Sequence, residues 1–340
     1  MVTRSLATCQ TKPCQSESWR QSLAASFTDV AALLESLGLR EADIPDLDRA
    51  TPPAFSVLVT REFAALMRPG DPEDPLLRQV LPLALEQARI PGYVMDPVGD
   101  TAADRGHGLL QKYAGRALLI ATGACAIHCR YCFRRHYPYA DRGAAAARGT
   151  SSLARIAEDL SLSEVILSGG DPLMLADDTL ERLVAQLAGI GHLQRLRIHT
   201  RLPVVLPKRV TERLCAILAG ARLETVVVIH VNHPNELGAD AEQSLRLLRR
   251  AGVTILNQSV LLRAVNDDST TLGQLSERLF RCGALPYYLH QLDPVSGAAH
   301  FQVSDQRARL LMQTLRQQLP GYLVPKLVRE VPGADSKMPI

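Results

Sequence analysis

Hydrophobic positions from about residue 116 onward fall into two alternating kinds of segment. Short apolar runs are typical of buried strands, and between them apolar residues recur every three or four positions, as on one face of a helix. The predicted strands are Ala117–Ala121, Glu164–Leu167, Leu196–His199, Thr225–Val231, Thr254–Val260 and Pro286–Leu289. The predicted helices are Leu153–Leu160, Thr179–Leu187, Thr211–Leu218, Glu242–Ala251 and Leu272–Arg281.

This alternation predicts an α/β fold built on a parallel sheet. Six strand–helix units favour a partial (β/α)6 barrel over a full eightfold barrel. A doubly wound sheet is the alternative. In either fold, the chemistry is expected at the carboxyl ends of the strands.

The first hundred residues lack this alternation. Ser22 to Leu37 carries apolar residues at helical spacing, and Gly38 stands where such a helix would stop. Frequent prolines between residues 45 and 97 predict short helices joined by turns. We interpret this part as a cap on the barrel or a subunit contact, with no identifiable chemistry of its own. The predicted divisions are a helical extension over 1–105, the barrel over 106–293 and a C-terminal segment over 294–340.

Composition narrows the functional classes. Of 340 residues, 46% are apolar and 21% charged, which is ordinary globular composition. The formal charge of +3 gives no basic footprint for nucleic acid. The longest apolar run, Thr225–Val231, is too short to span a bilayer, and no cationic start precedes an apolar run at the N-terminus. We therefore expect a cytoplasmic protein that binds neither nucleic acid nor membrane, in which clustered cysteines indicate metal rather than disulfides.

Three of the seven cysteines form such a cluster, with Cys125, Cys129 and Cys132 in a CxxxCxxC spacing after the first predicted strand. Zinc sites usually have four ligands and begin from a CxxC pair. No obvious fourth thiol lies near these three in the sequence. Cys215 and Cys282 fall within predicted helices, and Cys9 and Cys14 lie near the N-terminus. Three thiolates can bind three irons of a 4Fe–4S cube and leave the fourth iron open to S-adenosylmethionine (SAM). A zinc site or three buried thiols is the alternative.

Polar residues stand at the ends of the other predicted strands. The second strand is followed by Ser168, Gly169, Gly170 and Asp171, where the glycines would allow a ligand to approach the backbone closely. The later strands end in His199-Thr200-Arg201, in His230 to Pro234, near Gln258 and in His290 to Asp293. Since strand ends share one edge of a parallel sheet, we expect Ser168, Gly169, Gly170, Asp171, His230 and Gln258 to bind cofactors.

These strings resemble the lysine 2,3-aminomutase family of radical SAM enzymes over nearly the whole chain. The shared strings are Cys125-Ala-Ile-His-Cys-Arg-Tyr-Cys-Phe-Arg-Arg-His, Ser168-Gly-Gly-Asp-Pro-Leu, Asn257-Gln-Ser-Val-Leu-Leu-Arg and Asn266-Asp. Further strings look like the bacterial branch that acts in β-lysylation of translation elongation factor P. They are Asp74-Pro-Leu-Leu-Arg-Gln-Val-Leu, Pro286-Tyr-Tyr-Leu-His, Gly297-Ala-Ala-His-Phe and Gly321-Tyr-Leu-Val-Pro-Lys-Leu-Val-Arg-Glu.

The resemblance implies pyridoxal 5′-phosphate (PLP) as a further cofactor. Lys337 matches the family lysine that binds PLP covalently, although its surroundings alone would make it a solvated tail residue. The tail must then fold back over the barrel mouth, where partial desolvation would favour a neutral, nucleophilic amine. Tyr113 and Arg116 match positions near the PLP phosphate, a group that suits an arginine fork. For Lys112 beside them, a surface charge before the strand is an alternative interpretation.

The resemblance also implies a substrate site for L-lysine. Arg134 matches the arginine that holds the substrate carboxylate, and Asp293 and Glu330 match two acids around the distal ammonium. Glu330 replaces an aspartate of the catabolic enzymes, which puts the substrate fit in question. Two acids argue against glutamate as substrate. Asp268 stands where several catabolic enzymes carry a zinc-binding cysteine at a subunit contact, so we expect that zinc to be absent. Since the zinc supports a tetramer in those enzymes, both a dimer and a tetramer remain alternatives here.

The implied function is conversion of L-α-lysine to (R)-β-lysine, an isomerase reaction, before a lysyl-tRNA-synthetase-like ligase attaches the product to elongation factor P. A catabolic or osmolyte-producing aminomutase is one alternative. A non-catalytic iron–sulfur scaffold for the ligase is another, although a scaffold needs neither Lys337 nor Arg134 nor Asp293. A radical SAM enzyme without PLP is the third.

Overall fold

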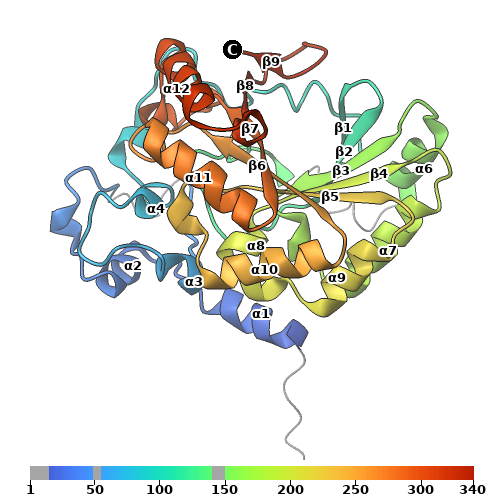
Figure 1. The fold of residues 1–340 in the computed structure, drawn as a ribbon, viewed down its shortest axis with the longest axis horizontal. Coiled ribbons are helices and arrows are strands. Elements are labelled where there is room, and N and C mark those ends of the chain that lie inside the picture. Colours follow the sequence, from blue (N-terminus) through green and yellow to red (C-terminus); the bar gives the residue numbers. More distant parts are fainter. Residues whose placement is uncertain (1–14, 49–54, 140–149) are drawn as a thin grey trace, which may run out of the picture.

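The sheet predicted from the hydrophobic pattern is present in the computed structural model, which describes residues 15–48, 55–139 and 150–340. Its nine strands follow one another in sequence order across a single curved sheet (Figure 1). The strands are β1 (Leu109–Tyr113), β2 (Arg116–Thr122), β3 (Glu164–Gly169), β4 (Arg195–Thr200), β5 (Glu224–Ile229), β6 (Thr254–Val260), β7 (Ala284–His290), β8 (Lys326–Arg329) and β9 (Met338–Pro339).

Strands β2 to β7 are the six predicted strands, and each pairs in parallel with the next. The order runs in one direction without reversal, whereas a doubly wound sheet reverses its order at a switch point. The partial (β/α)6 barrel is therefore confirmed and the doubly wound alternative is wrong. Two additional strands flank the six, because β1 pairs antiparallel with β2 and β8 pairs in parallel with β7. Their apolar stretches were too short to stand out in the sequence.

Helices cover the outside of the sheet (Figure 1). All five predicted helices are present, and each has an apolar face directed inward; in α10 the buried positions are Ala241, Ser244, Leu245 and Leu248. A sixth long helix, α12, was not predicted. The helices around the barrel are α6 (Thr150–Glu158), α7 (Asp177–Ala188), α8 (Leu202–Val205), α9 (Glu212–Ala219), α10 (Ala239–Arg250), α11 (Ser269–Arg281) and α12 (Asp305–Gln318).

The N-terminal extension consists of short helices, as the prolines predicted. They are α1 (Gln15–Ala24), α2 (Val30–Ser36), α3 (Arg61–Ala64) and α4 (Pro75–Arg78). The single helix expected over Ser22–Leu37 is wrong, because it is divided between α1 and α2. Phe27 leaves the helix to exchange two backbone hydrogen bonds with Val59, and Asp29 then caps α2 by accepting from the backbone N–H of Ala32 at 2.9 Å. Gly38 ends α2 with a positive φ of 68°, as expected.

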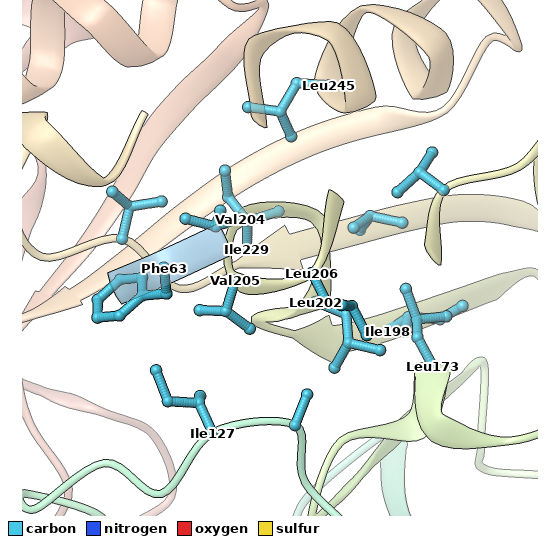
Figure 2. Packing of buried hydrophobic residues seen from close by; sticks show 14 of the residues in the cluster. Phe63, Ile127, Leu173, Ile198, Leu202, Val204, Val205, Leu206, Ile229 and Leu245 are labelled. Carbon is cyan, nitrogen blue, oxygen red and sulfur yellow. The ribbon is translucent and has the colours of Figure 1, made fainter. Parts of the chain in front are cut away.

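One hydrophobic core extends from this extension into the barrel. Figure 2 shows Phe63 of α3 beside Val204 and Val205 of α8, with Ile127 of the cysteine loop close by. Phe63 and Val205 have no exposed surface. Burial of apolar side chains stabilises by about 25 cal/mol per Å2, so this shared core ties the extension to the barrel.

Among the helices of the described residues, none is long and apolar enough to cross a membrane.

Short 3-10 helices complete the connections. They are η1 (Glu41–Asp43), η2 (Ala84–Gln87), η3 (Pro172–Met174), η4 (Pro207–Arg209), η5 (Pro234–Glu236), η6 (Ala299–Phe301) and η7 (Gly321–Leu323). Two of them matter for the site, because η2 carries Glu86 and η5 carries Glu236. Both carboxylates meet arginines described below.

Candidate active site

A cavity of about 880 Å3 opens where the carboxyl ends of the barrel strands meet. Every site residue predicted from the sequence lines it, including the pair of positions farthest apart in the set, Tyr113 and Lys337. The other lining residues from that set are Arg116, Cys125, Cys129, Cys132, Arg134, Ser168, Gly169, Gly170, Asp171, His230, Gln258, Asp293 and Glu330. The predicted site residues therefore lie together around one cavity, whereas their roles in the chemistry stay predictions.

The cysteine loop leaves β2 and is held from outside by the N-terminal extension. The backbone N–H of His128 donates to the carbonyl of Leu58 at 2.9 Å, and that of Arg130 donates to the carbonyl of Gln79 at 2.8 Å. Within the loop, the N–H of Cys132 donates to the carbonyl of Cys129. The extension thus does more than cap the barrel, because its backbone fixes the shape of the segment that carries the thiols.

A buried carboxylate reinforces this attachment. Glu86 accepts from Arg130 Nε at 2.8 Å and from Arg135 Nη2 at 2.6 Å. All three side chains are at most 5% exposed. Glu86 thus pairs with both guanidinium groups, so neither buried cation lacks an opposite charge beside it. Sequence reasoning missed Glu86, since nothing near it in the chain points to the cysteine loop.

Burial disfavours ionisation of two of the three thiols. Burial raises the pKa of Cys132 to about 11 and raises the pKa of Cys125 as well. Thiolate ligation must therefore displace protons, and metal binding at such a site couples to proton release. Among the residues with a described placement, no three His, Cys, Asp or Glu side chains converge on a single ion. A tetrahedral zinc needs its sulfurs about 2.3 Å from one point, whereas a cube offers a separate iron to each cysteine.

The glycines after β3 have a structural role. A Cβ on Gly169 would lie 2.4 Å from the carbonyl oxygen of Thr122, and one on Gly170 would lie 2.3 Å from that of Ala124. Gly169 also has a φ of 123°. These contacts are with the segment that leads from β2 into the cysteine loop. Gly169 and Gly170 therefore let the protein's own backbone approach closely, and both also line the cavity, where their contact with a ligand stays a prediction.

Asp171 likewise uses its carboxylate within the protein. It accepts from Thr200 Oγ1 at 2.7 Å, from the backbone N–H of Arg201 at 2.7 Å and from that of Leu173 at 3.0 Å. Burial raises its pKa to about 6. Its observed contacts therefore join the end of β3 to the end of β4, and they differ from the direct cofactor contact expected.

At the opposite side of the cavity, the tail folds back as the resemblance required. Strand β9 pairs antiparallel with β8, which brings Met338 opposite Arg329. Lys337 Nζ then lies 2.8 Å from Glu330 Oε2, and the hydroxyl of Tyr113 donates to Glu330 Oε1 at 2.7 Å. Although burial opposes ionisation, Lys337 and Tyr113 hold the pKa of Glu330 below its usual value. The solvated-tail interpretation of Lys337 is wrong.

A second acid, missed in the sequence, organises the neighbouring cations. Asp100 is 2% exposed and accepts from Arg134 Nε at 2.7 Å, while Lys112 Nζ lies 2.7 Å from its other oxygen. Arg134 Nη1 donates to Ser168 Oγ at 2.9 Å. Burial raises the pKa of Asp100, but Arg134 and Lys112 more than reverse that shift. Lys112 is thus part of the cavity wall, and the surface-charge interpretation is wrong.

Asp293 is the acid of the cavity that the protein leaves least compensated. Its Oδ1 is buried without a hydrogen-bond partner among the described residues. Burial raises its pKa to about 7, and Lys337 only partly offsets this effect. A buried carboxylate oxygen without a donor is expensive to maintain, so a cationic ligand at this position would relieve the penalty.

Histidines supply the neutral part of the cavity wall. Burial lowers the pKa of His230 to about 3 and also lowers those of His199 and His290. His230 Nε2 and the side-chain amide of Gln258 lie 2.8 Å apart, as the end of β5 meets β6. Arg116 lies over the ring of Tyr113, with 4.7 Å from Cζ to the centroid. The last two residues are the pair expected near a phosphate.

Asp268, expected to replace a zinc-binding cysteine, has a local role in this structure. It precedes α11 and accepts from the backbone N–H of Thr271 at 2.8 Å. A carboxylate at this position satisfies a free N–H group and interacts favourably with the helix dipole. Helix capping thus accounts for the residue without any metal.

The barrel and its cysteine loop define the class. The radical SAM superfamily profile matches residues 119–272, which span β2 to the start of α11. Such enzymes bind a 4Fe–4S cluster and SAM, and the three thiols in one cavity fit that cluster. The L-lysine 2,3-aminomutase of Escherichia coli K12 is 47% identical over 324 residues, covering 95% of this chain and 94% of that protein.

Two other similar proteins carry the same name. The Haemophilus influenzae protein is 45% identical over 95% of both chains, and the Clostridium subterminale protein is 35% identical over 84% of this chain and 69% of its own length. The chain belongs to the lysine 2,3-aminomutase family, and it is an isomerase of the radical SAM class.

The Asp100 cluster gives a stability prediction. Asp100→Asn leaves the buried Arg134 with much less compensating charge, so we expect a loss of about 3–5 kcal/mol in unfolding free energy. Urea denaturation followed by circular dichroism measures the loss. Asp43→Asn is the matched control, because the Arg40–Asp43 pair at 3.1 Å is exposed and screened by solvent, so its loss should change the unfolding free energy little. Equal losses in the two variants would contradict the role given to Asp100.

Proposed function

We propose that this enzyme converts L-α-lysine to (R)-β-lysine with PLP bound at Lys337. The observation that carries the proposal is that one cavity contains both the three cysteines and Lys337 with its surrounding acids. The names of the similar proteins support lysine as the substrate. When bound, the cluster and SAM supply a carbon-centred radical, and PLP supplies the conjugated ring system that makes nitrogen migration possible.

The residues at hand fit PLP. Lys337 supplies the amine, and Arg116 with Tyr113 offers a cation and a hydroxyl for the phosphate. The side chain of Lys337 is 23% exposed, and its ammonium group pairs with Glu330. A lysine side chain acts as a nucleophile through its amine, and Lys337 presents that amine to the cavity beside Glu330.

Arg134 is the proposed contact for the substrate carboxylate. Asp100 and Ser168 hold two of its nitrogens, so its guanidinium plane is fixed before substrate arrives. Fixing a group in advance reduces the entropy lost on binding. Because the guanidinium already lies beside the cavity, it can orient the α-carbon end of lysine relative to the cysteine loop.

The distal ammonium is proposed to bind between Asp293 and Glu330. Glu330 already holds the Lys337 ammonium at 2.8 Å, so substrate would replace one cation by another at the same carboxylate. Asp293 would gain the donor it lacks. Two acids at this end disfavour a glutamate side chain by charge repulsion. Tyr113 donates to Glu330 Oε1 at 2.7 Å and so helps to hold this carboxylate in place.

Anaerobic incubation of cluster-replete enzyme with SAM, PLP, a reductant and L-lysine should yield β-lysine, detected by chromatography. Lys337→Ala should abolish turnover, because the nucleophilic amine is lost, while iron content stays at the wild-type level. Turnover in the wild type without any requirement for added PLP, and no absorbance of a PLP imine, would instead favour a radical SAM reaction independent of PLP.

Lysine affinity should depend on pH through Asp293. Its pKa of about 7 is raised by burial, and an ammonium ligand stabilises the ionised form. Lysine binding to SAM-free enzyme should therefore weaken as pH falls from 8 to 6, approaching tenfold per unit below the pKa. The other charged groups near Asp293 are Lys337, Glu330, Lys112 and Asp100.

Calorimetry of Asp293→Asn is the control for that pH dependence. The variant should bind lysine weakly at every pH and lose most of the slope, since an amide does not titrate in this range. A slope that persists unchanged in Asp293→Asn would assign the titration to another group, with Glu330 the first to examine.

The pathway proposed is β-lysylation of elongation factor P, which the long shared strings at Asp74, Pro286 and Gly297 support. Deletion of the gene should lower the mass of purified factor P by one lysyl unit, and restoration of the active gene should recover it. An unchanged mass would favour the catabolic or osmolyte role. The ligase and factor are thus proposed as functional partners of a cytoplasmic homo-oligomer, either dimer or tetramer.

A further inference from the structure

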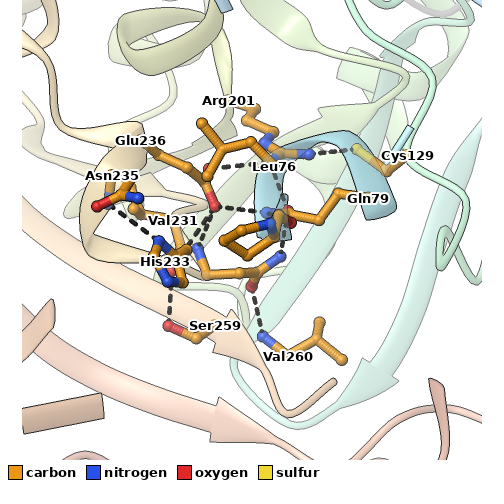
Figure 3. A network of polar contacts seen from close by, with 12 residues as sticks. Leu76, Gln79, Cys129, Arg201, Val231, His233, Asn235, Glu236, Ser259 and Val260 are labelled. Atoms are coloured by element: carbon orange, nitrogen blue, oxygen red, sulfur yellow. Dashed lines mark hydrogen bonds and ion pairs between the residues drawn. The ribbon is translucent and has the colours of Figure 1, made fainter. Parts of the chain in front are cut away.

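The end of β4 places a buried arginine against the cysteine loop. Arg201 is 5% exposed, and its Nη1 donates to Cys129 Sγ at 2.8 Å. Its Nη2 donates to Glu236 Oε2 at 2.9 Å and to Gln79 Oε1 at 2.8 Å. Figure 3 shows this fork, with the sulfur on one side of the guanidinium and the acceptors on the other. One side chain therefore links the extension, two strand ends and one proposed ligand of the cluster.

We propose that Arg201 is a positioning residue that donates a hydrogen bond to the Cys129 sulfur and thereby raises the reduction potential of the cluster. The proposal rests on the three cysteines as cluster ligands. It is independent of which substrate the enzyme takes and of PLP.

The anchoring of Arg201 is independent of the thiol. Glu236 is fully buried, and its Oε1 accepts from Gln79 Nε2, from the backbone N–H of Asn232 and from that of His233, each at 3.0 Å. These donors hold the carboxylate in place, and the carboxylate holds the guanidinium. A bidentate or forked arginine contact fixes direction as well as charge, so Nη1 stays directed at the sulfur.

Aromatic rings limit movement of the same guanidinium. Arg201 Cζ lies 5.1 Å from the ring centroid of Phe63 and 5.8 Å from that of Tyr131. Asn232 Nδ2 donates to the Tyr131 hydroxyl at 2.7 Å, which fixes that ring in turn. The arginine is therefore confined by packing from the extension and from the cysteine loop itself.

The consequence is electronic. Cluster potentials depend on net charge, burial and hydrogen bonds to the sulfurs. An N–H donor draws electron density from a ligating sulfur and favours the reduced, more negative cluster. In a buried site a charged donor acts strongly, because solvent does not screen it. Arg201 would thus ease the one-electron reduction that precedes SAM cleavage.

The test is the midpoint potential of the cluster in reconstituted enzyme, followed by electron paramagnetic resonance without lysine or PLP. Arg201→Gln should shift the reduction equilibrium about tenfold toward the oxidised cluster, about 59 mV for one electron. Arg201→Lys should retain part of the effect, since it keeps charge but loses the fork. An unchanged midpoint in cluster-replete Arg201→Gln enzyme would overturn the proposal.

Two further variants separate tuning from folding. Arg201→Gln leaves Glu236 buried without its cation, so the double variant Arg201→Gln/Glu236→Gln removes both charges. Because it still lacks the hydrogen bond to the Cys129 sulfur, its midpoint should remain below that of the wild type. Arg209→Gln is the matched control, because Arg209 is equally buried and paired with Asp177 at 2.8 Å. It should lose stability without a change of midpoint. An equal midpoint shift in Arg209→Gln would show a general packing effect and overturn the assignment.

Cluster content decides between tuning and assembly. If Arg201→Gln, Arg201→Lys and the double variant all fold but fail to bind iron, Arg201 holds the cluster in place and the tuning proposal is wrong. Wild-type enzyme that makes no β-lysine would reject the proposed function alone, because the midpoint comparison needs no substrate.

Discussion

The buried ion pair between Arg201 and Glu236 is the interaction on which the geometry of the site depends. It joins the end of β4 to the last residue of η5, and Gln79 adds the N-terminal extension to the same network. Replacing one member of a buried pair leaves the other charge uncompensated, at a cost of about 3–5 kcal/mol. The cysteine loop rests on this network, so the position of the thiols follows from it.

The same principle recurs on the other side of the cavity. Arg134 and Lys112 share Asp100, while Lys337 and Tyr113 share Glu330. Asp100 and Glu330 thus each face two partners, whereas Asp293 keeps a buried Oδ1 that has no hydrogen-bond partner among the described residues. Most charged side chains of the cavity wall are thus already paired with one another. What Asp293 Oδ1 lacks within the described part of the chain is a hydrogen-bond donor, which the distal ammonium of the proposed substrate would supply.

The N-terminal extension forms part of the site as well as covering the barrel. Its residues between 55 and 86 supply backbone acceptors for the cysteine loop, the Glu86 carboxylate and the Gln79 amide. It also shares the hydrophobic core of the barrel through Phe63. Removing it would therefore be expected to affect both packing and the thiol positions. The helical face and proline turns seen in the sequence gave no hint of this, since they describe local structure only.

The sequence by itself determined the local features. Six apolar runs marked β2 to β7, because buried strands are rich in apolar residues, and the CxxxCxxC spacing marked the loop proposed to bind the cluster. Family resemblance added Lys337 and Arg134. Only the tertiary structure decided which charges meet. Asp100 lies 34 residues from Arg134 and Cys129 lies 72 residues from Arg201, so no local pattern connects them. Their pairing arises because the sheet brings successive strand ends to one edge, where burial makes every uncompensated charge costly.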